Sequence, residues 1–306
     1  MFQLYLPIAE VSVNILLLLG LGLVVGFLSG MFGVGGGFLM TPTLIFFGVP
    51  PTVAVSTQAP QILASSFSGM LAHFRRDNVD LTMGAVLTFG GLLGSIIGVW
   101  LFALLRRVGQ IDLVIGLTFA ILLGVMGTLM LVESTRTILK TRKANPKREK
   151  LHKHYLLHRL PMKMRFRKSR LYISVALPLL IGLFVGVLVA IMGIGGGFIL
   201  VPAMIFLLGM PTLLAIGTSL FHIVFVTANT TFLHAMENQT VDIPLALLLT
   251  IGGVIGAQIG AGVGARLKAV QLRALLGLMV LAVAAKVIVD LVATPVDLYS
   301  IGQIRS

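Results

Sequence analysis

The chain has 306 residues, of which 57% are hydrophobic and only 11% are charged. Soluble domains carry about 25% charged residues, and their helices confine apolar side chains to one stripe rather than to the long unbroken runs found here. The composition therefore excludes an ordinary soluble domain and predicts a multi-pass membrane protein. The absence of cysteine also excludes disulfides, thiolate metal ligands and cysteine nucleophiles.

Apolar segments follow one another along the chain, separated by polar or Gly/Pro-rich stretches. Several exceed the roughly 20 residues that cross a bilayer core. In the first half we expect segments at 13–33, 37–49, 53–73, 81–105 and 111–133. In the second half we expect them at 171–192, 197–209, 213–235, 243–265 and 273–293. The second segment of each half is too short to span comfortably, so it is either a half-helix or one arm of a re-entrant hairpin.

The two halves repeat one glycine motif. The sequence GVGGGF at 33–38 recurs 160 residues later as GIGGGF at 193–198, and a proline follows each copy, at Pro42 and Pro202. Further matches continue the repeat at nearly the same offset, so each half is one structural unit. We expect an all-α polytopic membrane protein built from two repeats of about five hydrophobic segments, with short helices after the GxGGG breaks.

A basic linker joins the repeats. Of the 23 Lys and Arg, 14 lie between Arg136 and Arg170, so we expect a first transmembrane repeat at 1–133, a linker at 134–170 and a second repeat at 171–306. Short basic loops stay in the cytoplasm, and the placement of the other Lys and Arg favours repeats of inverted topology. The Arg136–Arg170 segment is also a candidate site for anionic lipids. We expect no nucleic-acid partner.

Two glycine series in the fourth segments have a spacing of four residues, which aligns them on one helix face. Such a face lets two helix backbones approach closely, so we expect a packing seam and assign these glycines no ligand. The series are Gly90, Gly94 and Gly98 in the first half, and Gly252, Gly256, Gly260 and Gly264 in the second.

A GxGGG run inside a membrane allows one helix to end and another to begin. The new helix start presents unpaired N–H groups and a partial positive charge, which together bind anions. Two such breaks in inverted halves would bring the helix starts at Phe38 and Phe198 near the midplane. The alternative reading of these glycines is a tight helix crossing.

The third segment of each half carries polar side chains, which are costly inside a membrane and mark transport pathways or bridge helices. For a single Ser or Thr, a hydrogen bond to its own helix is the simpler explanation. His222 is also a candidate for proton coupling, because imidazole titrates near neutral pH. The predicted substrate-binding residues are Gly33, Gly35, Gly36, Gly37, Phe38, Thr57, Gln58, Gln61, Gly193, Gly195, Gly196, Gly197, Phe198, Thr218, Ser219, His222 and Asn229.

With its duplicated GxGGG-x(4)-Pro motif, the Pro-Thr that follows each copy and its polar third segments, the chain resembles the TauE/SafE sulfite exporter family, a TSUP family of membrane transport proteins. The resemblance covers nearly everything except the linker. It implies a carrier of the bacterial or archaeal cytoplasmic membrane for sulfite or organosulfur anions such as sulfoacetate. The hallmark positions it implies are Gly33, Gly35, Gly36, Gly37 and Pro42, with Gly193, Gly195, Gly196, Gly197 and Pro202.

These observations predict a secondary transporter that exports sulfite or organosulfonate anions by alternating access around a midplane site. Protons are the candidate coupling ion. The alternatives are an importer of another small anion, such as thiosulfate or a carboxylate, and a non-transporting membrane scaffold. We expect neither an enzyme nor a metal or cofactor, because the core shows no acid pair, no metal-ligand cluster and no nucleophile–base spacing.

Overall fold

The computed structural model describes residues 3–33, 35–143, 163–264, 266 and 269–292. The elements of the first half are β1 (Gln3–Leu6), β2 (Val11–Asn14), α1 (Ile15–Phe32), α2 (Gly37–Phe46), α3 (Pro51–Arg75), α4 (Leu81–Arg107) and α5 (Ile111–Lys143). Those of the second are β3 (Lys163–Phe166), β4 (Leu171–Ser174), α6 (Ala176–Met192), α7 (Gly197–Phe206), α8 (Thr212–Leu233), the π-helix η2 (His234–Asn238), α9 (Ile243–Gly264) and α10 (Ala269–Val292). The predicted helical membrane architecture is confirmed, and two small β-hairpins are added to it.

Five helical stretches among the described residues are long and apolar enough to cross a membrane: α1, α4, Ile111–Leu129 of α5, Thr212–Asn238 and α9. Helix α3 is of similar length, with 25 residues, but carries the polar side chains predicted for the third segment. Helices α2 and α7 have only ten residues each, or roughly 15 Å, which is half a bilayer core. Both segments are therefore short helices, as predicted, a length that fits a half-helix and one arm of a re-entrant hairpin alike.

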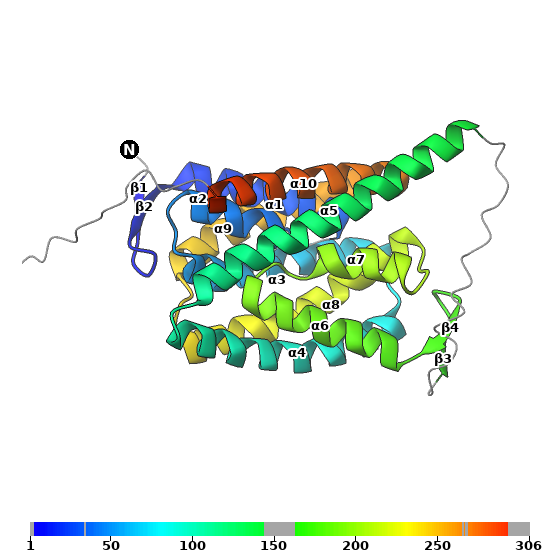
Figure 1. Ribbon diagram of the computed structural model, residues 1–306, viewed down its shortest axis with the longest axis horizontal. Coiled ribbons are helices and arrows are strands. Elements are labelled where there is room, and N and C mark those ends of the chain that lie inside the picture. Colours follow the sequence, from blue (N-terminus) through cyan, green and yellow to red (C-terminus); the bar gives the residue numbers. More distant parts are fainter. Residues whose placement is uncertain (1–2, 34, 144–162, 265, 267–268, 293–306) are drawn as a thin grey trace, which may run out of the picture.

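The large helix contacts all join the first half of the chain to the second. Helix α1 packs along α9, α4 along α6, and α5 along α10, while α3 and α8 lie against each other and against α9 and α4 respectively. Figure 1 shows the resulting bundle, in which helices distant in sequence run side by side. The two sequence repeats are consequently interlocked, and each completes the packing of the other.

The predicted glycine seams are present, and each joins the two halves. A Cβ added at Gly94 of α4 would lie 2.0 Å from the carbonyl oxygen of Leu183 in α6. A Cβ at Gly256 of α9 would lie 2.1 Å from the carbonyl oxygen of Leu23 in α1. Backbones this close leave no room for any side chain, which explains the spacing of four along each helix.

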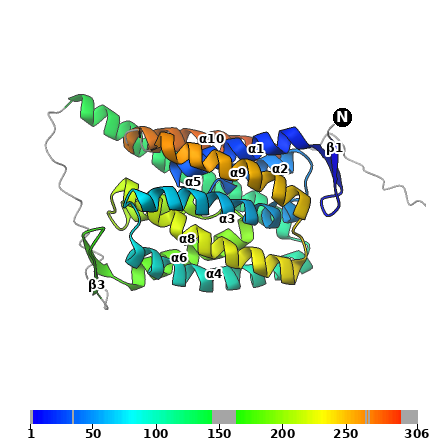
Figure 2. The same ribbon diagram turned by 180° about the vertical axis from the view of Figure 1, so that it is seen from behind.

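The two hairpins lie at opposite ends of the bundle (Figure 1, Figure 2). Hairpin β1–β2 pairs Gln3 with Asn14, and hairpin β3–β4 pairs Lys163 with Ser174, 160 residues later. Each precedes the first helix of its half, so the duplication extends upstream of the glycine motif. Strand β3 and the hairpin turn lie in the region predicted as linker, 134–170, whereas β4 falls at the start of the predicted second repeat. Helix α5 also continues into the linker region, to Lys143.

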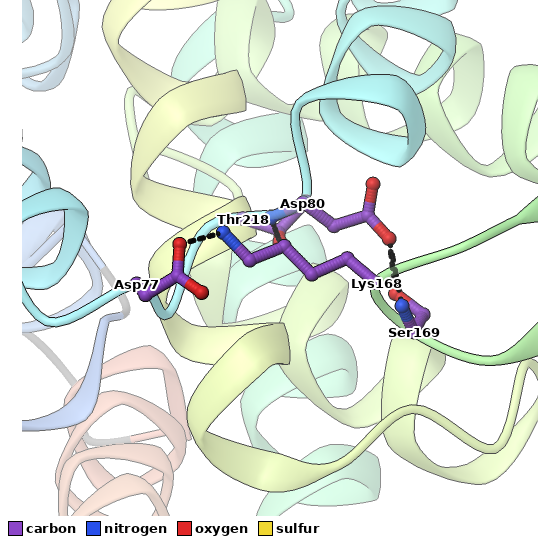
Figure 3. Close-up of polar contacts among 5 residues, drawn as sticks. All are labelled: Asp77, Asp80, Lys168, Ser169 and Thr218. Atoms are coloured by element: carbon purple, nitrogen blue, oxygen red, sulfur yellow. Dashed lines mark hydrogen bonds and ion pairs between the residues drawn. The ribbon is translucent and has the colours of Figure 1, made fainter.

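An aspartate from the other half holds each hairpin turn. Asp80 Oδ2 accepts hydrogen bonds from Ser169 N at 3.0 Å and Ser169 Oγ at 2.5 Å (Figure 3). Asp242 Oδ2 accepts from Ile8 N at 3.0 Å and Ala9 N at 3.4 Å. The other oxygen of each carboxylate caps a helix, accepting from Met83 N of α4 or Leu245 N of α9, both at 3.1 Å. Each aspartate therefore ties a hairpin of one half to a helix of the other.

Candidate functional site

The glycine motifs form two short loops between helices. Gly33 ends α1 and Gly193 ends α6, with φ values of 69° and 64°. Gly36 and Gly196 then begin α2 and α7, with φ values of 74° and 71°. Because left-handed backbone angles strain other residues, the helix can end and restart within four residues only if glycine occupies these positions. This is the break that the sequence predicts.

The two loops meet each other in the interior of the molecule. A Cβ built on Gly35 would lie 3.3 Å from Gly195 Cα, and one on Gly37 would lie 2.5 Å from the carbonyl oxygen of Gly193. The rings of Phe38 and Phe198, both fully buried, have centroids 6.1 Å apart. The tight crossing and the helix break are thus features of the same glycines. In this conformation the loops are closed against one another.

Side chains from α3 and α8 hold the loops in place. The Gln58 side-chain amide donates hydrogen bonds to the carbonyl of Gly193 and to Thr41 Oγ1. Ser219 Oγ, at the equivalent position of α8, lies 2.8 Å from the carbonyl oxygen of Gly33 and donates to it. Each half therefore provides a polar group to the carbonyl of the glycine at which the other half's helix ends.

One turn further along, Gln61 and His222 occupy equivalent buried positions. Both side chains are fully buried, and none of their side-chain nitrogen or oxygen atoms has a hydrogen-bond partner among the described residues. The His222 ring lies near the Leu87 backbone without meeting hydrogen-bond geometry. Buried polar groups are nearly always paired, so two unpaired ones at matched positions require an explanation.

A glycine makes room for each of these side chains. A Cβ at Gly91 of α4 would lie 2.4 Å from His222 Cε1, and one at Gly253 of α9 would lie 2.6 Å from Gln61 Nε2. Ser29, also buried without a partner, packs beside the loop at Gly36. Sequence reasoning missed Ser29 and this use of Gly91 and Gly253. The adjacent glycine pairs at 90–91 and 252–253 were the available signal, since only one member of each pair belongs to the series spaced by four residues.

Three predicted site residues make other contacts. Thr57 Oγ1 accepts from Asp242 N at 2.9 Å, and Thr218 Oγ1 accepts from Asp80 N at 3.0 Å, so both threonines brace the aspartates at the ends of the bundle. Asn229 Nδ2 donates to Ser95 Oγ at 2.8 Å. These bonds bridge helices, which is the structural alternative for polar residues in membranes.

The helix starts at the loops offer N–H groups rather than side chains. Among the described residues, no side chain caps α2 or α7. The first backbone N–H groups that bond to the cap carbonyls are those of Leu39, to Gly36 O, and Ile199, to Gly196 O, at 3.1 Å each. The N–H groups that precede them lie where helix starts bind anions. The interior thus combines two such helix starts with the unpaired amide of Gln61 and the imidazole of His222.

The sequence model of the sulfite exporter TauE/SafE family matches residues 18–287, which include both glycine loops and both polar helices. The chain belongs to the TauE/SafE family. This TauE/SafE protein is 30% identical over 279 residues to a "Probable membrane transporter protein" of Xylella fastidiosa strain 9a5c, covering 90% of this chain and 95% of that one. No solved structure matches it.

Two relatives from Bacillus subtilis strain 168 extend the comparison. The probable membrane transporter proteins YjnA and YunE are 29% and 28% identical to this TauE/SafE protein over 245 and 253 residues. The alignments cover 80% of this chain in both cases, and 87% and 86% of the relatives. Together with its membrane-length helices, these relationships make the protein a multi-pass bacterial membrane protein of a transporter family.

Proposed function

We propose that this protein is a secondary transporter that exports sulfite or an organosulfonate across the cytoplasmic membrane. One observation carries the proposal: Gln61 and His222 are buried, have no hydrogen-bond partner among the described residues, and are equivalent in the two halves, on the helices α3 and α8 whose Gln58 and Ser219 hold the glycine loops. Sulfite and sulfonates present several oxygens that amide N–H groups, a carboxamide and an imidazole can bind without a permanent buried cation. Family membership supports the substrate class.

Alternating access supplies the transport cycle in this proposal. The glycine loops touch in the present conformation, so the substrate reaches them only when the two halves separate at one end of the bundle. Hairpins at opposite ends, each held by an aspartate of the other half, support an inverted arrangement of the repeats. We assign the end with the basic hairpin β3–β4 to the cytoplasm.

His222 is the proposed coupling residue. Imidazole is the side chain that changes charge near neutral pH, and Gln61 at the matched position cannot titrate. A protonated His222 would bind an anion more strongly than a neutral one, so release of the proton would favour release of the anion. The His222→Gln variant keeps a polar side chain of similar size and removes the titration.

Efflux from liposomes tests the proposal. Vesicles with the purified protein are loaded with sulfite, sulfoacetate, thiosulfate or acetate, and initial efflux is followed with and without an imposed pH gradient. We expect sulfite or sulfoacetate efflux that the gradient accelerates. Gln61→Ala and His222→Ala should each slow it at least tenfold, and His222→Gln should remove the response to the gradient.

The matched control is Thr231→Val in α8, because the hydrogen bond that Thr231 Oγ1 makes within the described residues goes to its own helix, at Thr227 O. Size-exclusion chromatography of each variant separates a loss of transport from a loss of folding. Efflux of acetate alone would support a transporter but contradict the proposal that its substrate is a sulfur anion. No efflux of any anion would favour the scaffold, and normal kinetics in both alanine variants would remove Gln61 and His222 from the mechanism.

A further inference from the structure

A cleft of about 510 Å³ lies between hairpin β3–β4 and the connection from α3 to α4. Arg165, Arg167 and Lys168 of the hairpin line one side, and Phe74 and Leu81, at the end of α3 and the start of α4, line the other. The cleft is separate from the glycine loops. It lies at the end of the bundle shown in Figure 3.

Three basic side chains and two carboxylates line the cleft, so its formal net charge is +1. Lys168 pairs with Asp77, and the Asp80 carboxylate accepts hydrogen bonds from Ser169 (Figure 3). The other Asp80 oxygen caps α4 at Met83 N. Arg165 and Arg167 are exposed, and neither forms an ion pair within the described part of the chain. A cleft with two free guanidinium groups attracts a phosphate or another oxyanion, because guanidinium matches oxyanion geometry with paired donors.

The opposite wall of the cleft combines exposed apolar side chains with Asp77, Asp80 and Thr82. Phe74 has 50% and Leu81 has 49% of its surface accessible, at the ends of two bundle helices. A small free anion gains nothing from such a wall. A phospholipid matches both walls, because its phosphate would meet the arginines while its acyl chain would cover the apolar side chains.

The other hairpin shows that basic residues are not required for docking. Hairpin β1–β2 is held by Asp242 in the same way, yet it contains no Lys or Arg, and Glu10 stands where Arg170 stands in β3–β4. Both residues adopt the same left-handed backbone, with φ values of 55° and 54°. The basic side chains of β3–β4 are therefore additions to a shared scaffold, which indicates a role beyond holding the turn.

We propose that this cleft binds the headgroup phosphate of an anionic phospholipid in the leaflet at the β3–β4 end of the bundle. Arg165 and Arg167 hold the phosphate, and Phe74 and Leu81 pack against the acyl chain. The site would anchor hairpin β3–β4, and through Ser169 and Asp80 the start of α4, to the membrane surface. The proposal does not depend on which anion is transported.

The test uses the full-length protein in an uncharged detergent. The thermal unfolding midpoint is measured with added phosphatidylglycerol, with phosphatidylcholine of the same acyl chains, and with inorganic phosphate. We expect phosphatidylglycerol at about ten times its dissociation constant to raise the midpoint by about 3 °C, and the other two additives to leave it unchanged. Arg165→Gln with Arg167→Gln should weaken phosphatidylglycerol binding roughly 25-fold, about fivefold per charge.

Arg170→Gln is the matched control, because Arg170 is exposed on the same turn but does not line the cleft. It should keep the phosphatidylglycerol response. Native mass spectrometry of retained lipid gives a second readout, and the single variant Arg167→Gln replaces the double one if that fails to fold. A response that survives in the double variant, or an equal response to phosphatidylcholine, would overturn the proposal. An equal response to inorganic phosphate would assign the cleft to a free anion instead.

Discussion

Gln58 in the first half and Ser219 in the second perform the same task with different chemistry. Each donates a hydrogen bond to the carbonyl of the glycine that ends the other half's first helix. One residue earlier, Thr57 and Thr218 are the same amino acid and make the same bond to an aspartate N–H. One turn later, Gln61 and His222 differ again, and neither has a hydrogen-bond partner among the residues that the structure describes. The halves therefore keep the same residue at the aspartate contacts and differ in the residues that hold the glycine loops and at the unpaired positions.

The two ends of the bundle also combine a shared contact with different side chains. Asp80 and Asp242 each cap a helix and hold a hairpin turn, while the hairpins themselves differ, one being basic and the other carrying Glu10. Duplication thus preserves the backbone geometry and leaves exposed or unpaired side chains free to specialise. Four sets of variants test this comparison.

The largest effect is expected at the seams, which should respond alike in both halves. Gly94→Ala and Gly256→Ala would each place a Cβ about 2 Å from a carbonyl oxygen, so the packed helices must separate. We expect each to cost about 3 kcal/mol or more in unfolding free energy. Gly262→Ala, in the same helix as Gly256, is the control, because a Cβ there meets nothing within 4 Å. Denaturant titration measures the costs, and a tolerated Gly94→Ala would contradict the seam.

The next-largest loss of stability is expected when the aspartates at the two ends of the bundle are replaced. Asp80→Ala and Asp242→Ala each leave buried N–H groups of a helix cap and a hairpin turn without an acceptor. We expect about 2 kcal/mol of destabilisation from each. Asp80→Asn retains one acceptor oxygen and should cost less. A loss at only one end, measured by thermal unfolding, would show that the two ends are not equivalent.

Substitutions of the residues that hold the glycine loops should have different energetic costs in the two halves. Gln58→Ala removes hydrogen bonds to two groups outside its own helix, Gly193 O and Thr41 Oγ1. Ser219→Ala removes one such bond, to Gly33 O, and a second bond to Ile216 O of its own helix. We expect about 2 kcal/mol for the first and about 1 kcal/mol for the second. Equal costs in the same unfolding assay would mean that the side-chain difference has no energetic consequence.

The exposed ion pair at the basic end should matter least. Asp77 is 89% and Lys168 is 35% accessible at the side chain, so water screens their attraction. Lys168→Gln and Asp77→Asn should each change the unfolding free energy by less than about 0.5 kcal/mol. A larger loss of unfolding free energy in either variant would indicate that the ion pair, like Asp80, fixes hairpin β3–β4 to the bundle.

Much of this architecture could be predicted because it depends on local patterns. Long apolar runs marked the spanning helices, the positions of Gly33 and Gly36 marked a helix break, and the spacing at Gly94 and Gly98 marked a seam. The hairpins were missed because each strand has only four residues, and the basic residues of β3–β4 merge with those of the linker. Strand pairing of that length has no reliable periodic signal.

The candidate site was predicted only in part. The glycine loops, Gln58 and Ser219 were named and do meet, whereas Thr57, Thr218 and Asn229 were named and bond elsewhere. A polar residue on a membrane helix has the same sequence signature in both cases. Only the identity of its partner distinguishes a bridging side chain from an unpaired one.

The sequence by itself determined that this chain is a duplicated, helical membrane protein with two broken helices, because hydropathy, glycine spacing and the repeat are properties of the chain alone. The tertiary structure decided how the halves combine: α1 packs on α9 rather than within its own repeat, and each aspartate holds the other half's hairpin. It also decided that Gln61 and His222 are buried without a hydrogen-bond partner in the described part of the chain. Such contacts join residues up to 234 positions apart, and no local pattern specifies them.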